Sequence, residues 1–250
     1  MPRSEAKAGT TAPPFHPNCR CVIVPYDEEF RDEYRIMRDP VTGKSKIIEN
    51  MTFKEWKEKY GTSRDELASG KVGEKAAIEQ KTIDRLGAFT YPGMTKAQNA
   101  TMLTRQKELL AYAMAENNSD EVAFLLDSKL RRIATEKGDE RNVDVTAMLR
   151  KNQGYENLQI LHNHPRGSSF SMYDVRVLLE CNNVKGVSLL TNRGRIETLQ
   201  KTEKYDRIKA AGIVQDVIRQ SRKEIGVAVS VIIKKILQNL ERERVLIWKK

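Results

Sequence analysis

The chain has 250 residues, of which 39% are hydrophobic and 31% charged, and its formal net charge is +10 at pH 7. This length is enough for one sizeable hydrophobic core. The absence of an apolar run of about 18 residues excludes a transmembrane helix, residues 1–30 lack a signal-peptide pattern, and three cysteines are too few for a disulfide framework.

The sequence divides into four segments: an irregular segment (1–60), a linker with one short helix (61–94), the main folded domain (95–200) and a basic helical tail (201–250). The Pro, Ala, Thr and Gly content of residues 1–18 predicts an extended chain. Residues 21–26 favour a short strand. A capping-box pattern at residues 52–55 predicts a helix that continues to about residue 60.

The main domain begins with a helix and two strands. Residues 95–117 have the composition and periodicity of a long helix, with four apolar side chains near one face: Met102, Leu109, Leu110 and Met114. Residues 121–126 and 130–135 predict two strands joined by a turn. A short helix near Met148 follows, and then a buried strand over residues 158–162 that leads directly into two histidines.

The remaining elements complete an α/β (α+β) fold with a mixed sheet flanked by helices. Residues 171–182 predict a helix with three inward side chains: Val175, Leu178 and Leu179. Residues 186–190 and 195–199 predict a hairpin. From residue 201 the chain is mostly helical and ends in a basic amphipathic stretch that contains Ile232, Ile236 and Leu240.

The charge excess is concentrated in this tail. Residues 201–250 carry 13 basic and 6 acidic side chains, a surplus of 7 out of the total of +10. Such a tail can bind nucleic acid, an anionic membrane surface or an acidic partner. The alternative is a solvated helix face without a ligand. The stretch from residue 225 to 240 can pack on the core, pair with another chain or lie on a membrane.

Two of the three histidines, His162 and His164, stand one residue apart at the end of the predicted buried strand. Because residues i and i+2 of a strand point to the same side, both imidazoles can reach one ion. A glycine-containing turn can then bring in Asp174 as a third ligand. Two nitrogens, a carboxylate oxygen and a water form the open tetrahedral site of catalytic zinc. Glu121, at the head of an earlier strand, is the candidate general base and acid.

Each part of this pattern also has a simpler interpretation. A surface His-x-His pair can bind nothing. Ser171 and Asp174 form an ordinary helix capping box, and glutamate is common at the start of a strand. The combination is more specific than its parts, and a capping serine can still donate a hydrogen bond to a substrate.

The sequence from His162 to Pro165, followed by Ser171-x-x-Asp174, resembles the JAMM (JAB/MPN) metalloprotease motif, and its spelling HNHP is similar to the RadC-like branch. This resemblance covers about residues 95–200 and implies a cytidine deaminase-like mixed sheet. It further implies that His162, His164 and Asp174 bind Zn²⁺, that Glu121 carries the proton and that Ser171 steadies the oxyanion. One departure is that six residues, instead of the family's usual seven, separate His164 from Ser171.

Residues 13–21, with His16, Cys19 and Cys21, resemble the closing motif of phage Mu F-like minor head proteins, and residues 38–44 and 51–56 fit their usual tail. This resemblance covers residues 1–60. It implies that the chain is the end of a longer protein or a shortened relative, with phage portal or head proteins as partners, in a phage virion or the bacterial cytoplasm. His16, Cys19 and Cys21 can clamp a metal, with Cys181 as a remote fourth ligand, or form a packed loop.

Three functions follow from these patterns. The first is a zinc-dependent hydrolase of peptide or isopeptide bonds, acting on a peptide or protein substrate as an effector or processing domain of a phage head-associated protein. The second is a catalytically inactive structural minor head protein, which the shorter loop between His164 and Ser171 suggests. The third is a metal-dependent nuclease, for which the basic tail and the metal-capable histidines are the motive.

Overall fold

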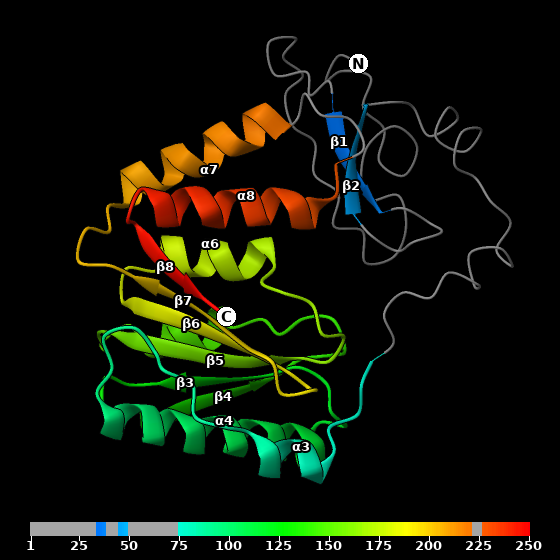
Figure 1. Cartoon of the computed structure of the whole chain (residues 1–250), viewed down its shortest axis with the longest axis vertical. Coiled ribbons are helices and arrows are strands. Elements are labelled where there is room, and N and C mark those ends of the chain that lie inside the picture. The colour runs from blue at the N-terminus through cyan, green and yellow to red at the C-terminus, as the bar shows by residue number, and fades with distance from the viewer. Residues whose placement is uncertain (1–33, 39–44, 50–74, 222–226) are drawn as a thin grey trace, which may run out of the picture.

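A computed structural model describes residues 34–38, 45–49, 75–221 and 227–250. At its centre lies a six-stranded mixed sheet, whose strands lie one above another in the middle of Figure 1. Its strands, in spatial order, are β4 (Arg132–Lys137), β3 (Val122–Leu126), β5 (Leu158–His164), β6 (Val184–Thr191), β7 (Ile196–Lys201) and β8 (Leu246–Lys249). Strands β5 and β6 are parallel, and every other neighbouring pair in this sheet is antiparallel.

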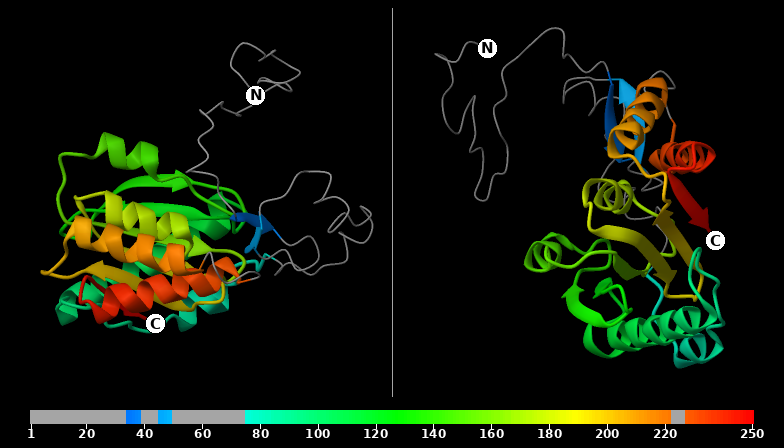
Figure 2. Two further views of the ribbon diagram at one scale, coloured as in Figure 1. Left: turned by 90° about the horizontal axis from the view of Figure 1, so that it is seen from above. Right: turned by 90° about the vertical axis from the view of Figure 1, so that its left-hand side faces the viewer.

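Helices cover both faces of the sheet (Figures 1 and 2). One face packs against α3 (Gln80–Arg85) and α4 (Lys96–Glu116). The other packs against four helices: α5 (Thr146–Lys151), α6 (Met172–Glu180), α7 (Arg207–Ser221) and α8 (Val229–Arg242). Because both faces are covered, strands β3 and β5 are buried along their whole length.

The alternation of side chains along the strands divides the core into two layers. We call the layer beneath α3 and α4 the α4 layer, and the layer beneath α5 to α8 the α6 layer. In β3, Phe124 packs with the α4 layer, while Leu125 packs with the α6 layer. In β5, Leu161 faces α4 and Ile160 faces α6. His162 and His164 continue the series of Ile160 and therefore point to the α6 side.

The structure confirms the predicted mixed α/β architecture and most of the predicted elements. Helix α4 begins after Thr95, which forms a capping box with Gln98, and ends before Asn117. The two predicted strands after it, the short helix near Met148 and the hairpin of β6 and β7 are all present. Strand β5 is longer than predicted, because it continues through His164.

The predicted helical tail did not include strand β8. Residues Leu246–Lys249 pair antiparallel with β7 and extend the sheet by one strand. Helix α8 packs back on the core, where Ile236 and Leu240 are fully buried. Of the three placements considered for residues 225–240, packing on the core is therefore the one observed for the described part of this stretch.

The described part of the N-terminal segment contains a two-stranded antiparallel sheet that was not predicted. It consists of β1 (Tyr34–Arg38) and β2 (Ser45–Glu49). Ile47 of β2 is buried in the α6 layer and donates its backbone N–H to the Val227 carbonyl at 3.2 Å. The predicted extended chain of residues 1–18, strand 21–26 and helix 52–60, as well as His16, Cys19 and Cys21, lie outside the described residues.

In the part of the chain that the structure describes, no helix is both long and apolar enough to cross a membrane.

Candidate metal centre

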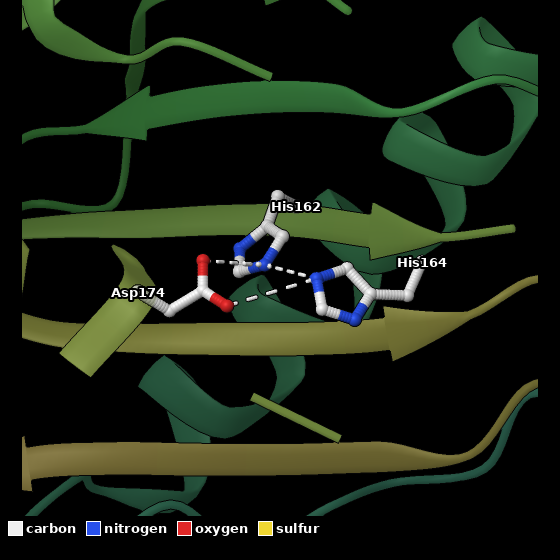
Figure 3. Close-up of side chains that lie close together, drawn as sticks. All are labelled: His162, His164 and Asp174. Carbon is white, nitrogen blue, oxygen red and sulfur yellow. Dashed lines mark hydrogen bonds and ion pairs between the residues drawn. The ribbon is translucent and has the colours of Figure 1, made fainter. Parts of the chain in front are cut away.

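Strand β5 presents His162 and His164 side by side on the α6 face of the sheet (Figure 3). Their Nε2 atoms lie 3.0 Å apart, and the two side chains are almost completely buried. Neighbouring strands hold this part of β5 on both sides, since His162 pairs with Ala123 of β3 and with Leu189 of β6. The sheet therefore fixes the spacing of the two imidazoles.

Asp174 comes to these histidines from the first turn of α6 (Figure 3). Its Oδ1 lies 3.3 Å from His162 Nε2, and its Oδ2 lies 3.8 Å from His164 Nε2. Ser171 caps the helix: its hydroxyl accepts the Asp174 N–H at 3.2 Å, and its backbone N–H and hydroxyl both donate to Asp174 Oδ2 at 2.7 Å. The capping box therefore orients the carboxylate instead of competing with its place among the histidines.

The separations between the three side chains fit a single small cation. His162, His164 and Asp174 each offer one ligand atom, and these atoms all lie within 4.8 Å of one another. Bonds of about 2.0–2.1 Å at tetrahedral angles place zinc ligands about 3.3 Å apart. The measured 3.0 Å between the two Nε2 atoms and 3.3 Å from His162 to Asp174 are close to this spacing. The cluster could therefore hold a metal ion.

The charge state of the histidines also suits metal binding. Burial, opposed by nearby Asp174, lowers the pKa of His162, and burial together with His162 lowers the pKa of His164 to about 4. Both imidazoles are then neutral near pH 7, which is the form that binds metals. Burial opposes the ionisation of Asp174, but the histidines and the Ser171 hydrogen bonds outweigh it and lower the pKa of this carboxyl.

Ser168 turns the Nε2 atom of His164 toward the cluster. The Nδ1 atom on the other side of the ring lies 2.9 Å from the Ser168 hydroxyl and 3.3 Å from the Ser168 carbonyl oxygen. A proton on Nδ1 can be donated to that carbonyl, which leaves the Nε2 lone pair free. This arrangement, in which the outer ring nitrogen is held by a second group, is common for histidines that bind metals.

Glu121 lies at the edge of the cluster, just before β3 begins. Its Oε1 is 3.9 Å from His164 Nε2, and its side chain is 8% exposed. Burial raises the pKa of this carboxyl to about 8, and Asp174, Asp139 and Asp120 add to the effect. The structure thus brings together Glu121, the two histidines, Asp174 and Ser171, which are the five residues assigned to the zinc site from the sequence.

The shorter loop between His164 and Ser171 still delivers Asp174 to the histidines. Gly167 takes a left-handed conformation, with φ +70°, that tightens the turn. Arg195, from the loop before β7, donates to the Gly167 and Ser168 carbonyls at 2.9 and 3.2 Å. Ser169 donates to the buried carboxylate of Glu197 at 2.6 Å, and this carboxylate lies 2.7 Å from Arg195. Neither Arg195 nor Glu197 was identified from the sequence.

Asn163, between the two histidines, is a further residue of the centre that was not identified from the sequence. It points away from them, is fully buried, and accepts the Val122 N–H at 2.8 Å. Its amide donates to the Asp120 carbonyl at 3.1 Å and to Asn192 Oδ1 at 2.8 Å. Asn163 therefore holds the peptide groups on both sides of Glu121. The period of two along β5 was the available signal, because it places residue 163 on the opposite face from the histidines.

Comparisons of the chain with protein-family models, with curated proteins and with solved structures found no match. Its function must therefore be inferred from the residues of the centre itself.

Proposed function

We propose that the chain is a zinc-dependent hydrolase of peptide or isopeptide bonds, with His162, His164 and Asp174 as the metal ligands. The observation that carries this proposal is the gathering of three buried ligand atoms within 4.8 Å, with Glu121 3.9 Å from one of them. Two imidazoles and one carboxylate are the ligand set of several catalytic zinc sites, which keep a further position open.

The residues around the cluster divide the chemical work. When bound, zinc lowers the pKa of a coordinated water and polarises a substrate carbonyl. In its ionised form, which a nearby cation would favour, Glu121 would take the proton of the attacking water and return it to the leaving amine. The Ser171 backbone N–H holds the Asp174 carboxylate in its orientation, and the Ser171 hydroxyl, which donates to the same carboxylate, would turn to donate to the developing oxyanion. Asn163 keeps Glu121 in place from the other face of the sheet.

Two sequence resemblances support the biological setting of this proposal. The motif from His162 to Asp174 resembles the RadC-like branch of the JAMM metalloproteases, in which the corresponding residues bind zinc. Residues 1–60 resemble phage Mu F-like minor head proteins. The proposed role is therefore an effector or processing domain of a phage head-associated protein, with portal or head proteins as partners, in a virion or the bacterial cytoplasm.

A structural metal site in an inactive minor head protein is the second candidate function. The low exposure of the ligands favours it: His162 is 2%, His164 5% and Asp174 9% exposed. A cavity beside His162 and Asp174 measures about 10 Å³, which is roughly the space of one water. Both candidates require the metal, and they differ in whether Glu121 acts on a substrate.

Metal analysis of the purified protein tests what both candidates share. We expect stoichiometric zinc in the wild-type protein and its loss in His162→Ala, because one of three ligands is removed. A wild-type protein that takes up no zinc would overturn the hydrolase and the structural metal site, and would leave only an inactive structural head protein without a metal.

Glu121→Gln separates the two candidates. The proposal expects this variant to retain zinc and to lose hydrolysis of an unstructured peptide, whereas Glu116→Gln, at the exposed end of α4, keeps full activity. Full activity of Glu121→Gln would remove this residue from the mechanism, and a wild-type protein with zinc but no activity would favour the structural role. Cleavage of DNA or RNA with divalent metals that His162→Ala abolishes would replace the peptidase with a nuclease.

A further inference from the structure

A groove of about 380 Å³ lies next to the metal centre, between β2, the β5–α6 loop, α8 and β8. This volume is within the range of roughly 300–1,000 Å³ that is usual for ligand pockets. Its apolar lining includes Phe170, Ile233, Leu237 and Trp248. Of its lining residues, the mechanism proposed above uses only Ser171.

One wall of the groove is the same loop that supports the metal centre. Ser168 contacts His164, Ser171 holds Asp174, and both residues line the groove. The ring of Phe170 lies 6.5 Å from the ring of His162. A peptide bound in the groove therefore lies close to the metal centre.

The charged side chains of the groove indicate which kind of group a bound peptide carries beside its apolar side chain. Lys234 and Lys250 line it, and no acidic side chain does so among its described lining residues. The Lys250 ammonium lies 4.2 Å from the centre of the Trp248 ring, which keeps the charge beside the apolar wall. Glu197 contacts this wall through Ser169 and Trp248 but is fully buried and faces Arg195. The groove is therefore apolar inside and carries positive charge.

We infer that this groove is a substrate-recognition subsite for a peptide segment in which a large apolar side chain is followed by a carboxylate. The carboxylate is either the C-terminus of the peptide or an adjacent acidic side chain, because both place the same group near Lys234 and Lys250. The inference rests on the proposed peptidase function, since it assigns the substrate class of that site. It differs from that function in that it can be tested by binding alone.

Binding of short peptides to the zinc-loaded protein tests the subsite without any need for turnover. The fluorescence of Trp248 reports on the groove in a Trp56→Phe background, which leaves Trp248 as the single tryptophan. Three probes separate the sources of the carboxylate: acetyl-Leu-Leu as the free acid, the same peptide as its amide, and acetyl-Leu-Glu amide. We expect both carboxylate probes to bind about tenfold more tightly than the amide, the factor typical of a hydrogen bond to a charged group.

Two exposed positions on α8 provide a matched pair of variants. Ser230 lines the groove and Gln238 does not, so Ser230→Arg blocks it while Gln238→Arg adds the same charge elsewhere on the helix. We expect Ser230→Arg to lose binding of all three probes and Gln238→Arg to retain it. Lys234→Gln should reduce the preference for the carboxylate severalfold, while Lys204→Gln, outside the groove, leaves it unchanged.

Three results would overturn the inference and leave the peptidase proposal standing. The first is zinc-dependent peptide hydrolysis without binding of any probe, and the second is equal affinity for acid and amide. In the third, Ser230→Arg leaves probe binding intact but converts a dimer into a monomer, which would make the groove an interface between copies. Conversely, probe binding with the expected preferences in a protein that hydrolyses nothing would refute the peptidase alone.

Discussion

Replacement of Asn163 by alanine tests whether the residue between the two histidines positions the proposed general base. The fully buried Asn163 amide accepts the Val122 N–H and donates to the Asp120 carbonyl and to Asn192 Oδ1. The alanine variant removes all three hydrogen bonds without changing the proposed metal ligands. Because Glu121 lies between the two held peptide groups, its carboxylate should lose its fixed position beside His164.

The expected loss of stability follows from these three bonds. Each contributes about 1 kcal/mol net, and each partner left buried and unsatisfied adds to the cost, so a total of about 3–5 kcal/mol is expected. For a chain of this size, that corresponds to a fall in Tm of roughly 6–20 °C. The proposed hydrolysis should fall through kcat with little change in KM, because the proposed general base moves while the proposed subsite stays intact.

A double-mutant cycle with Asn192 provides the most direct assay. Asn192 accepts from Asn163 and donates to the Ala76 and Ser119 carbonyls, so the two amides share one network. Chemical denaturation of the single and double alanine variants should show a coupling energy of about 0.5–3 kcal/mol. Zinc content should stay at the wild-type level in each folded variant. Additive effects within about 0.3 kcal/mol, or full activity of Asn163→Ala, would refute the positioning role.

Four further predictions concern the charges of the centre, its metal and the packing of the sheet. Since the pKa of Glu121 is raised to about 8, the folded protein favours the neutral acid of this side chain. Its contribution to the free energy of unfolding is therefore lost as pH rises from about 4.5 through 8. Glu121→Gln should therefore raise the Tm of the metal-free protein at pH 9 but not at pH 4. Since burial lowers the pKa of His162 and His164, the metal-free protein should lose stability as pH falls below about 6.5. Zinc at about 100 times its Kd should add about 2.7 kcal/mol to the free energy of unfolding at pH 7. Gly186→Ala should destabilise the sheet around β6, because the new Cβ would lie 2.3 Å from Gln159 Oε1 and 3.2 Å from the Leu199 carbonyl oxygen. Gln159→Ala should recover the part of the loss that comes from Gln159.

Each of these predictions has a distinct contradictory result. Equal Tm values of Glu121→Gln and wild type at pH 9 would show that the fold does not favour the neutral carboxylic acid of Glu121 over its carboxylate. A free energy of unfolding that does not change between pH 7 and 5 would show that the fold does not lower the pKa values of the histidines. An equal stabilisation by zinc in His164→Ala would place the metal elsewhere. Wild-type stability of Gly186→Ala would contradict the close approach of Gln159.

Some features of the centre could be predicted because they depend on neighbours in the chain. The period of two along a strand placed His162 and His164 on one face whatever the rest of the fold did. The Ser171-x-x-Asp174 spacing marked the start of α6, and the same capping interaction orients the Asp174 carboxylate. Glu121 was identified by its place before an apolar run. Its distance of 3.9 Å from His164 depends on the pairing of β3 with β5, which local pattern does not determine.

Other features were decided by contacts between distant segments. Leu246–Lys249 lies among charged residues and was predicted as part of a helical tail, yet the free edge of β7 makes it a strand. Asn163 became significant only when the fold brought Val122 and Asn192 beside it. The groove exists only because α8 and β8 pack beside the β5–α6 loop. The sequence alone determined which residues can bind a metal, because ligand chemistry and strand period are local properties. The tertiary structure decided which of them meet, because strand pairing and helix packing depend on the burial of the whole core.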